Sequence, residues 1–114
     1  MYFVFLKVSM KSLLLQLTGE MPLFKIIDFF VDNKGMDFSK SEIAEVAEIS
    51  RASLFQYWNV LDTHKIVKVT RRFGKTRLYT LNANCEITRR ILDLEKALIS
   101  ESLNREQMMK PIAV

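Results

Sequence analysis

The stretch from residue 38 to residue 81 constrains the fold more than any other part of the sequence. Ser39 and Glu42 have the spacing of a capping box, which predicts that a helix begins here. This helix is expected to bury one apolar face: Ile43, Val46 and Ala47. A short turn at 48–50 follows, and Ser50 is placed to cap a second helix over 51–64. The apolar side chains of the second helix also recur at helical spacing: Leu54, Trp58 and Leu61.

A basic hairpin is predicted directly after this helix-turn-helix. Residues 66–72 and 76–81 are rich in β-forming residues and flank Phe73-Gly74-Lys75, which is a hairpin signal. From 51 to 77 the sequence has seven Lys and Arg residues against Asp62 alone, as a phosphate-binding surface requires. A helix that fits the major groove, followed by a hairpin beside it, suits duplex DNA. The alternative is that the charge only protects a solvated edge strand.

The whole chain has 114 residues and a net charge of +4, and it is expected to form one small domain. Cys85 is the single cysteine, so no internal disulfide is possible, which suits a reducing cytoplasm. No stretch is long enough to span a membrane, and no membrane partner is expected. The expected segments are an N-terminal apolar segment that is a candidate dimer contact (1–19), a winged helix-turn-helix domain (20–83), a C-terminal dimerisation helix (84–106) and a tail (107–114).

A strongly apolar helix is predicted after Pro22. One face is complete at helical spacing: Leu23, Ile26, Ile27 and Phe30. Phe24, Phe29 and Val31 extend the apolar surface around the helix. Such a helix needs cover on more than one side, and we expect either the N-terminal segment or a second subunit to supply it.

The last helix is expected from about Cys85 to Leu103. It carries an apolar stripe with the 4, 3, 4 spacing of a coiled-coil seam: Ile87, Ile91, Leu94 and Leu98. Two heptads do not hold a coiled coil alone, but they suffice as part of a homodimer interface. The alternative is that this helix packs back on its own domain.

Four motifs carry a family resemblance: Phe38-Ser39-x-Ser41-Glu42-Ile43-Ala44, Ile49-Ser50-Arg51-x-Ser53-Leu54, the run from Ile66 to Lys75, and Leu78-Tyr79-x-Leu81-Asn82. Together they resemble the winged helix-turn-helix transcription regulators of the ArsR and MarR type, especially small archaeal members. The resemblance covers about residues 23–82. It implies a mainly α fold with a small β-hairpin wing (an α+β winged helix) and a C-terminal dimerisation helix. It also implies a homodimer that places two recognition helices and two wings on one operator.

Two positions depart from the family pattern. Lys65 stands where the family usually has Gly, and a left-handed conformation there costs about 1 kcal/mol relative to Gly. Phe55 stands where a small or polar residue usually faces DNA. It is expected either to touch a thymine methyl group or, by slight preference, to pack partly against Phe38 or the wing.

The predicted DNA contacts lie on recognition helix 51–64, on its cap and on wing 66–82. On the helix and its cap they are Ser50, Arg51, Ser53, Phe55, Gln56, Tyr57 and Asn59. On the wing they are Lys68, Arg71, Arg72, Lys75 and Arg77. Arg51 is expected to read guanine or clamp a phosphate, and Gln56 to pair with adenine. Tyr57 and Asn59 are expected to touch the DNA backbone.

Other classes of function find little support in the sequence. With one His and one Cys, and with no Gly-rich phosphate loop, we expect neither an enzyme nor a metal or cofactor site. His64 is expected in the last turn of helix 51–64, where a cation interacts favourably with the helix dipole, rather than in a ligand or catalytic role. The predicted function is therefore a homodimeric, sequence-specific regulator of transcription that binds double-stranded DNA in the cytoplasm. A winged-helix module for protein contacts, or a regulator that responds to redox state or to an unknown small molecule, stays open as the alternative.

Overall fold

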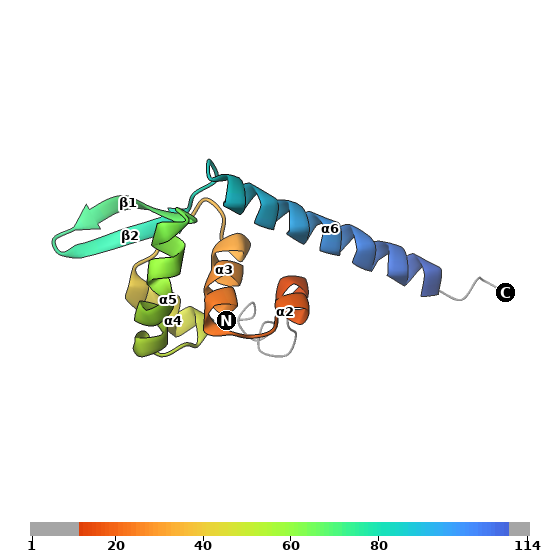
Figure 1. Cartoon of the computed structure of the whole chain (residues 1–114), viewed down its shortest axis with the longest axis horizontal. Helices are drawn as coiled ribbons and strands as arrows, with labels where there is room; N and C mark the ends of the chain where they lie inside the picture. The colour runs from red at the N-terminus through yellow and green to blue at the C-terminus, as the bar shows by residue number, and fades with distance from the viewer. Residues whose placement is uncertain (1–11, 110–114) are drawn as a thin grey trace.

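The computed structural model, which describes residues 12–109, is an α+β winged helix, as predicted. Its elements in chain order are α2 (Leu13–Thr18), α3 (Pro22–Asp32), α4 (Lys40–Ala47), α5 (Arg51–Thr63), β1 (Val67–Phe73), β2 (Thr76–Leu81) and α6 (Glu86–Met109). The hairpin and α6 project in opposite directions from the small helical body (Figure 1). Residues 1–11 and 110–114 lie outside the described part, as do the predictions that concern them. No helix within residues 12–109 is long and apolar enough to cross a membrane.

Helix α3 forms the centre of the core and packs against α2, α4, α5 and β2. Pro22 opens it in the first turn, where the missing N–H costs little. Phe29 and Val31 are buried by other parts of the same chain. A second subunit, one of the two expected sources of cover, is therefore not needed to bury them. The ring of Phe29 meets the rings of Phe38 and Phe30 edge-on, at centroid distances of 4.7 and 5.5 Å. Phe38 comes from the loop before α4. The spacing of apolar residues within α3 alone does not reveal that this ring covers Phe29.

Local hydrogen bonds account for the helix-turn-helix. Both halves of the predicted capping box are present: Ser39 N donates to Glu42 Oε1, and Glu42 N donates to Ser39 Oγ. The turn between α4 and α5 is closed by Glu48 in a left-handed conformation, and Lys25 Nζ from α3 donates to its carbonyl at 3.2 Å. Ala44 is buried on α4 while Val46 is half exposed, which corrects the predicted face, because Val46 points away from α3 and α5 at helical spacing.

The wing is an antiparallel hairpin that closes through Gly74 and Lys75. Gly74 has φ 61°, a conformation that suits glycine in so tight a turn. The register shifts between Val69 and Arg71, which leaves Thr70 as a bulge that bends the strand. Lys65 has φ 56°, so the left-handed conformation considered from the sequence is present just before the wing.

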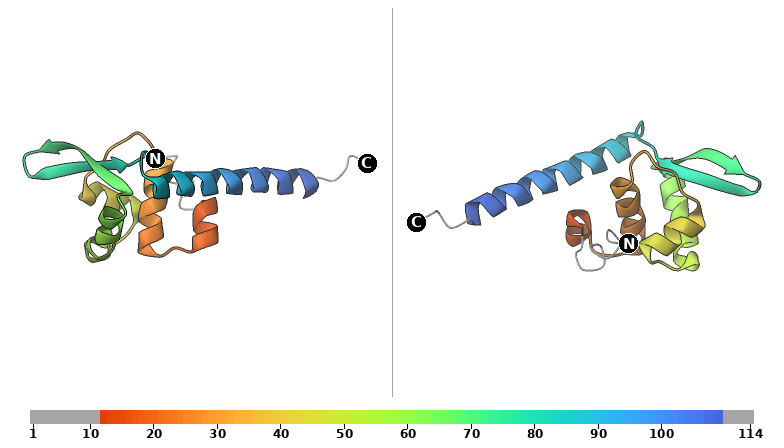
Figure 2. Two further views of the ribbon diagram at one scale, coloured as in Figure 1. Left: turned by 45° about the horizontal axis from the view of Figure 1, so that its top comes forward. Right: turned by 180° about the vertical axis from the view of Figure 1, so that it is seen from behind.

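The last helix, α6, begins at Glu86 and ends at Met109, beyond the predicted end at Leu103. An ion pair one turn apart, Arg105 Nε to Glu101 Oε2 at 2.8 Å, supports the additional turns. At the other end, buried Thr88 donates to the carbonyl of Ile66 at 3.4 Å and ties α6 to the start of the wing. The C-terminal half of α6 extends well past the helical body in each view of Figure 2.

Candidate nucleic-acid interface

Helix α5 has one face in the core and one face in solvent. Its buried side chains are the three predicted from the sequence: Leu54, Trp58 and Leu61. Its solvent face carries four of the predicted DNA contacts: Arg51, Phe55, Gln56 and Asn59. Ser53 and Tyr57 are half-buried on the flank, and Ser50 caps the helix by accepting from Ser53 N at 3.1 Å. The exposed polar face therefore runs along α5 from its first turn.

Two side chains on this face differ in how firmly they are held. Arg51 Nη2 donates to Ser41 Oγ on α4 at 3.2 Å, which orients the guanidinium at the start of α5. Phe55 is 62% exposed, so the preference for packing against Phe38 or the wing is wrong. Phe38 instead uses its ring against Phe29, and its backbone pairs with Tyr79 at the base of the wing. The exposed phenyl group is accessible from solvent on α5, and its contact with a thymine methyl group stays a prediction.

On the wing, Arg71 has an internal partner that the charge pattern did not reveal. Its Nε and Nη2 donate to the two carboxylate oxygens of Asp37, at 2.9 and 3.0 Å, and Thr70 Oγ1 also donates to Asp37. The same guanidinium carbon lies 5.4 Å from the ring centroid of Phe73. This pairing orients the hairpin and partly neutralises one of its predicted phosphate contacts.

The other wing cations lack such a partner in the described part of the chain. Arg72 and Arg77 are paired directly across the hairpin, and Lys75 lies in the turn between them. Lys68 is exposed closer to the base. Like charges opposite each other weaken a hairpin, and none of these four side chains has an ion pair within residues 12–109. An unbalanced cluster of this kind favours an external anion.

The sequence pattern did not indicate Lys40. It lies in the first turn of the otherwise acidic helix α4, half-buried, with its Nζ close to the faces of three aromatic rings. The centroid distances are 4.9 Å to Trp58, 5.5 Å to Phe55 and 5.6 Å to Tyr79. Only the fold brings these rings, which come from α5 and β2, to a lysine of α4, so no local signal reveals the cluster.

The predicted apolar stripe of α6 divides into two parts. Ile91 and Leu98, together with Leu92, pack against the core of the same chain, in agreement with the alternative interpretation of this helix. Ile87 and Leu94 stay 41% and 39% exposed. Ile99 and Leu103 are also exposed further along the helix. Thus α6 packs partly on its own domain and still presents an uncovered apolar face.

Cys85 and His64 meet at the start of α6. The Cys85 thiol donates to the His64 carbonyl at 3.2 Å. Burial raises the pKa of this thiol, but the polar groups of Thr88, the backbone N–H of Ile87 and the charge of Arg89 together lower it further than burial raises it. The net pKa is below its ordinary value. Within residues 12–109, no three His, Cys, Asp or Glu side chains form a group that would hold a metal ion.

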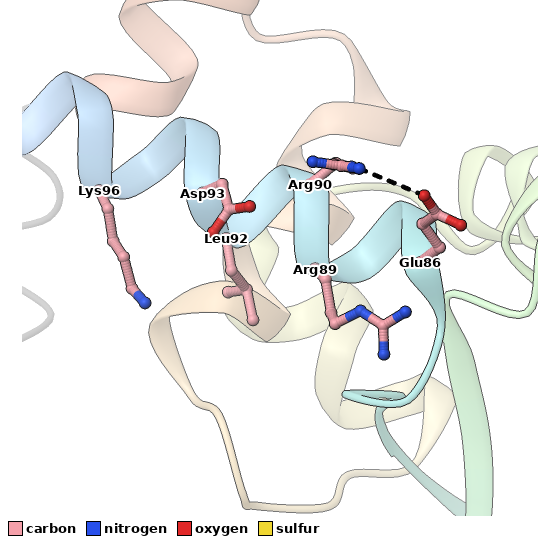
Figure 3. A pocket seen from close by; sticks show the side chains of 6 residues that line it. All are labelled: Glu86, Arg89, Arg90, Leu92, Asp93 and Lys96. Carbon is pink, nitrogen blue, oxygen red and sulfur yellow. Dashed lines mark hydrogen bonds and ion pairs between the residues drawn. The ribbon is translucent and has the colours of Figure 1, made fainter.

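A shallow depression of about 370 Å³ lies along α6. Figure 3 shows the six side chains that line it: Glu86, Arg89, Arg90, Leu92, Asp93 and Lys96. Arg90 Nη2 and Glu86 Oε2 form an ion pair at 3.4 Å at one end. All six belong to one helix, so the depression is an open surface rather than an enclosed ligand site.

No family model and no curated protein matches the chain. Several solved structures resemble it, among them the following two. The structure of NadR in complex with 4-hydroxyphenylacetate has a TM-score of 0.49 and 24% identity, over 75% of this chain and 63% of that one. The MarR family transcriptional regulator SPO1453 from Silicibacter pomeroyi DSS-3 has a TM-score of 0.49 and 13% identity, over 78% of this chain and 58% of that one. The chain thus spans less than two thirds of either protein, and neither likeness assigns it a family or a ligand.

Proposed function

We propose that this chain is a sequence-specific regulator of transcription that binds double-stranded DNA, with α5 in the major groove and the wing on the flanking backbone. One observation carries the proposal: the wing, which bears four exposed cations without an anionic partner within residues 12–109, lies at the same end of the molecule as α5 (Figure 1). Helix α5 has exposed polar side chains along its solvent face. Unpaired cations of this kind supply the electrostatic part of DNA affinity. The polar face of α5 supplies donors and acceptors for base edges.

The proposal includes a homodimer. The exposed Ile87 and Leu94 of α6 leave apolar surface along a helix that projects away from the wing, which favours a second copy of the chain there. A two-fold axis through such an interface would place two copies of α5 about 34 Å apart, one turn of DNA. The operator is then expected to be a near-palindrome.

The test is the salt dependence of duplex binding, measured by fluorescence anisotropy on DNA selected from a random pool. If the dimer makes about six phosphate contacts, the slope of log K against log salt should be near −5. A protein-contact module would show no retention of duplex DNA at low salt. That result, or a flat salt response, would exclude the proposed function.

A further inference from the structure

Lys40 is held in an unusual place for a surface lysine. Its ammonium group has three ring faces within 5.6 Å and no anionic partner within the described residues. Two of the rings, Phe55 and Trp58, belong to α5, and the third, Tyr79, belongs to the base of the wing. The cation therefore occupies the junction between the two elements that the proposed function places on DNA.

Contact with ring faces restrains a cation without using up its hydrogen bonds. The attraction comes from the charge on the ring face, so the N–H groups of the ammonium keep the capacity to donate to oxygen. The rings also limit the positions of a long side chain that otherwise loses much rotamer freedom on binding. Lys40 is thus pre-organised to donate to an anion at the junction of α5 and the wing.

We propose that Lys40 binds a DNA phosphate between the recognition helix and the wing, and that the rings of Phe55, Trp58 and Tyr79 position its ammonium group for this contact. This rests on the proposed function, which it deepens by adding a phosphate contact from α4. A phosphate that borders the major groove lies between a helix inside the groove and a wing on the flanking backbone. The negative charge of α4, which includes Glu42 and Glu45, does not remove the contact, because neither carboxylate forms an ion pair with Lys40.

The competing explanation is that Lys40 only covers the aromatic core. In that case removal of the charge would change stability and leave the electrostatics of DNA binding intact. The two explanations differ in the salt slope, since only a lysine that displaces counterions from phosphate contributes to it.

The experiment compares Lys40→Met with Lys96→Met. Both changes remove one charge and keep an unbranched side chain. Lys96 is exposed on α6 (Figure 3), the helix that projects away from the wing (Figure 1). Lys40→Met should reduce the magnitude of the salt slope by about 0.9 per chain, whereas Lys96→Met should leave it unchanged. Lys40→Arg, which keeps the charge, should restore the slope. Methionine packs well against rings, and the urea midpoint of each variant shows whether it still folds.

A second measurement uses Trp58, the single tryptophan of the chain. Its indole N–H is buried without a hydrogen-bond acceptor in the described part of the chain, and the Lys40 ammonium lies 4.9 Å from the centroid of its ring. Phosphate bound to Lys40 should shift the Trp58 emission of the wild type on addition of DNA, and Lys40→Met should abolish the shift. A folded Lys40→Met variant with the wild-type slope and the wild-type shift would overturn the inference and leave DNA binding intact. Absence of salt-dependent DNA binding by the wild type would overturn both.

Discussion

The carboxylate of Asp37 accepts hydrogen bonds from both Nε and Nη2 of Arg71, although the two residues are 34 positions apart. Thr70, at the bulge of β1, donates to the same carboxylate. Asp37 directly precedes Phe38, whose backbone pairs with Tyr79. The contacts of Asp37 with Thr70 and Arg71, called the clamp below, therefore join the entrance of α4 to the middle of the wing. The clamp thus ties the wing to the loop that leads into the helix-turn-helix.

The first prediction concerns the pH dependence of this clamp. Hydrogen bonds from Arg71 and then Thr70 lower the pKa of Asp37 from 3.8 to about 2. A carboxyl group with a lowered folded-state pKa stabilises the fold above its unfolded pKa, and this stability is lost as the pH falls towards the folded pKa. The difference in urea midpoint between wild type and Asp37→Asn should therefore be constant from pH 7 to 5 and shrink between pH about 4 and 2. A difference that persists unchanged at pH 2 would show that the carboxylate charge is not what stabilises the wing.

Arg71 and Arg72 are neighbours on β1 and are predicted to act differently. Arg72 has no anionic partner within residues 12–109, so Arg72→Ala should weaken binding to all DNA sequences about equally and lower the magnitude of the salt slope by about one for each subunit. Arg71→Ala should act by releasing the clamp. Asp37→Ala should then reproduce much of its effect on DNA affinity, and the double variant should be no worse than either single one, as expected for a coupled pair. Additive effects would instead make Arg71 an independent phosphate ligand.

Gln56 is predicted to read a base. It lies on the exposed face of α5, and its amide group matches the N6 and N7 edge of adenine. Gln56→Ala should relax the preference at one base pair and cost about 1–3 kcal/mol per half-site. The matched control is Asn59→Ala, one turn further along, which should weaken binding without changing the selected motif. An unchanged motif for Gln56→Ala would mean that α5 does not enter the groove in the proposed orientation.

The elements that local patterns specify were predictable from the sequence. The capping box at Ser39, the cap at Ser50 and the glycine at 74 act over a few residues, so each can be read in place. The three buried side chains of α5 follow from spacing alone. For the same reason the winged-helix class and the limits of α5 and of the hairpin were within reach of the sequence.

Contacts between distant segments were not predictable in this way. Asp37 pairs with Arg71, which follows the bulge at Thr70, and two residues 34 positions apart give no local signal of this contact. The position of Lys40 over three rings depends on how α4, α5 and β2 meet. The division of the α6 stripe depends on where α6 crosses the core, since Ile91 and Leu98 pack inwards while Leu94 stays exposed.

Glu95 is predicted to oppose folding when it is ionised. Burial raises its pKa, the nearby Lys34 partly opposes this, and Asp32 and Asp28 raise it further. A group whose folded-state pKa is raised stabilises the fold at low pH, and this stability is lost as the pH rises through that pKa. Glu95→Gln should therefore be at least as stable as the wild type at pH 7, despite removal of the 3.7 Å ion pair to Lys34. Its free energy of unfolding should also vary less with pH than that of the wild type in the range where glutamate side chains titrate. Glu106→Gln, an exposed change on the same helix, should leave the urea midpoint unchanged; a clear loss of stability in Glu95→Gln would show that the ion pair outweighs burial.

The last prediction concerns the dimer, for which α6 offers two distinct sets of apolar side chains. Leu98 is partly buried against its own core, so a charge there would also destabilise the fold and could not report on assembly alone. Leu94 is 39% exposed, so Leu94→Lys should leave the fold intact, place a charge in the proposed interface and shift the chain towards monomer. Because a monomer holds only one recognition helix and one wing on the operator, DNA affinity should fall steeply although no DNA-facing residue has changed.

Ser100→Lys is the matched control for that change. It adds the same charge to an exposed position of α6, on the side of the helix away from the stripe at helical spacing, and should stay dimeric. Sedimentation of wild type and both variants at equal concentration measures the assembly directly. A monomeric wild type would refute the dimer. It would also refute the proposed binding to two half-sites, which requires two subunits. A Leu94→Lys variant that remains a dimer would place the interface elsewhere, with the exposed Ile99 and Leu103 as the next positions to change.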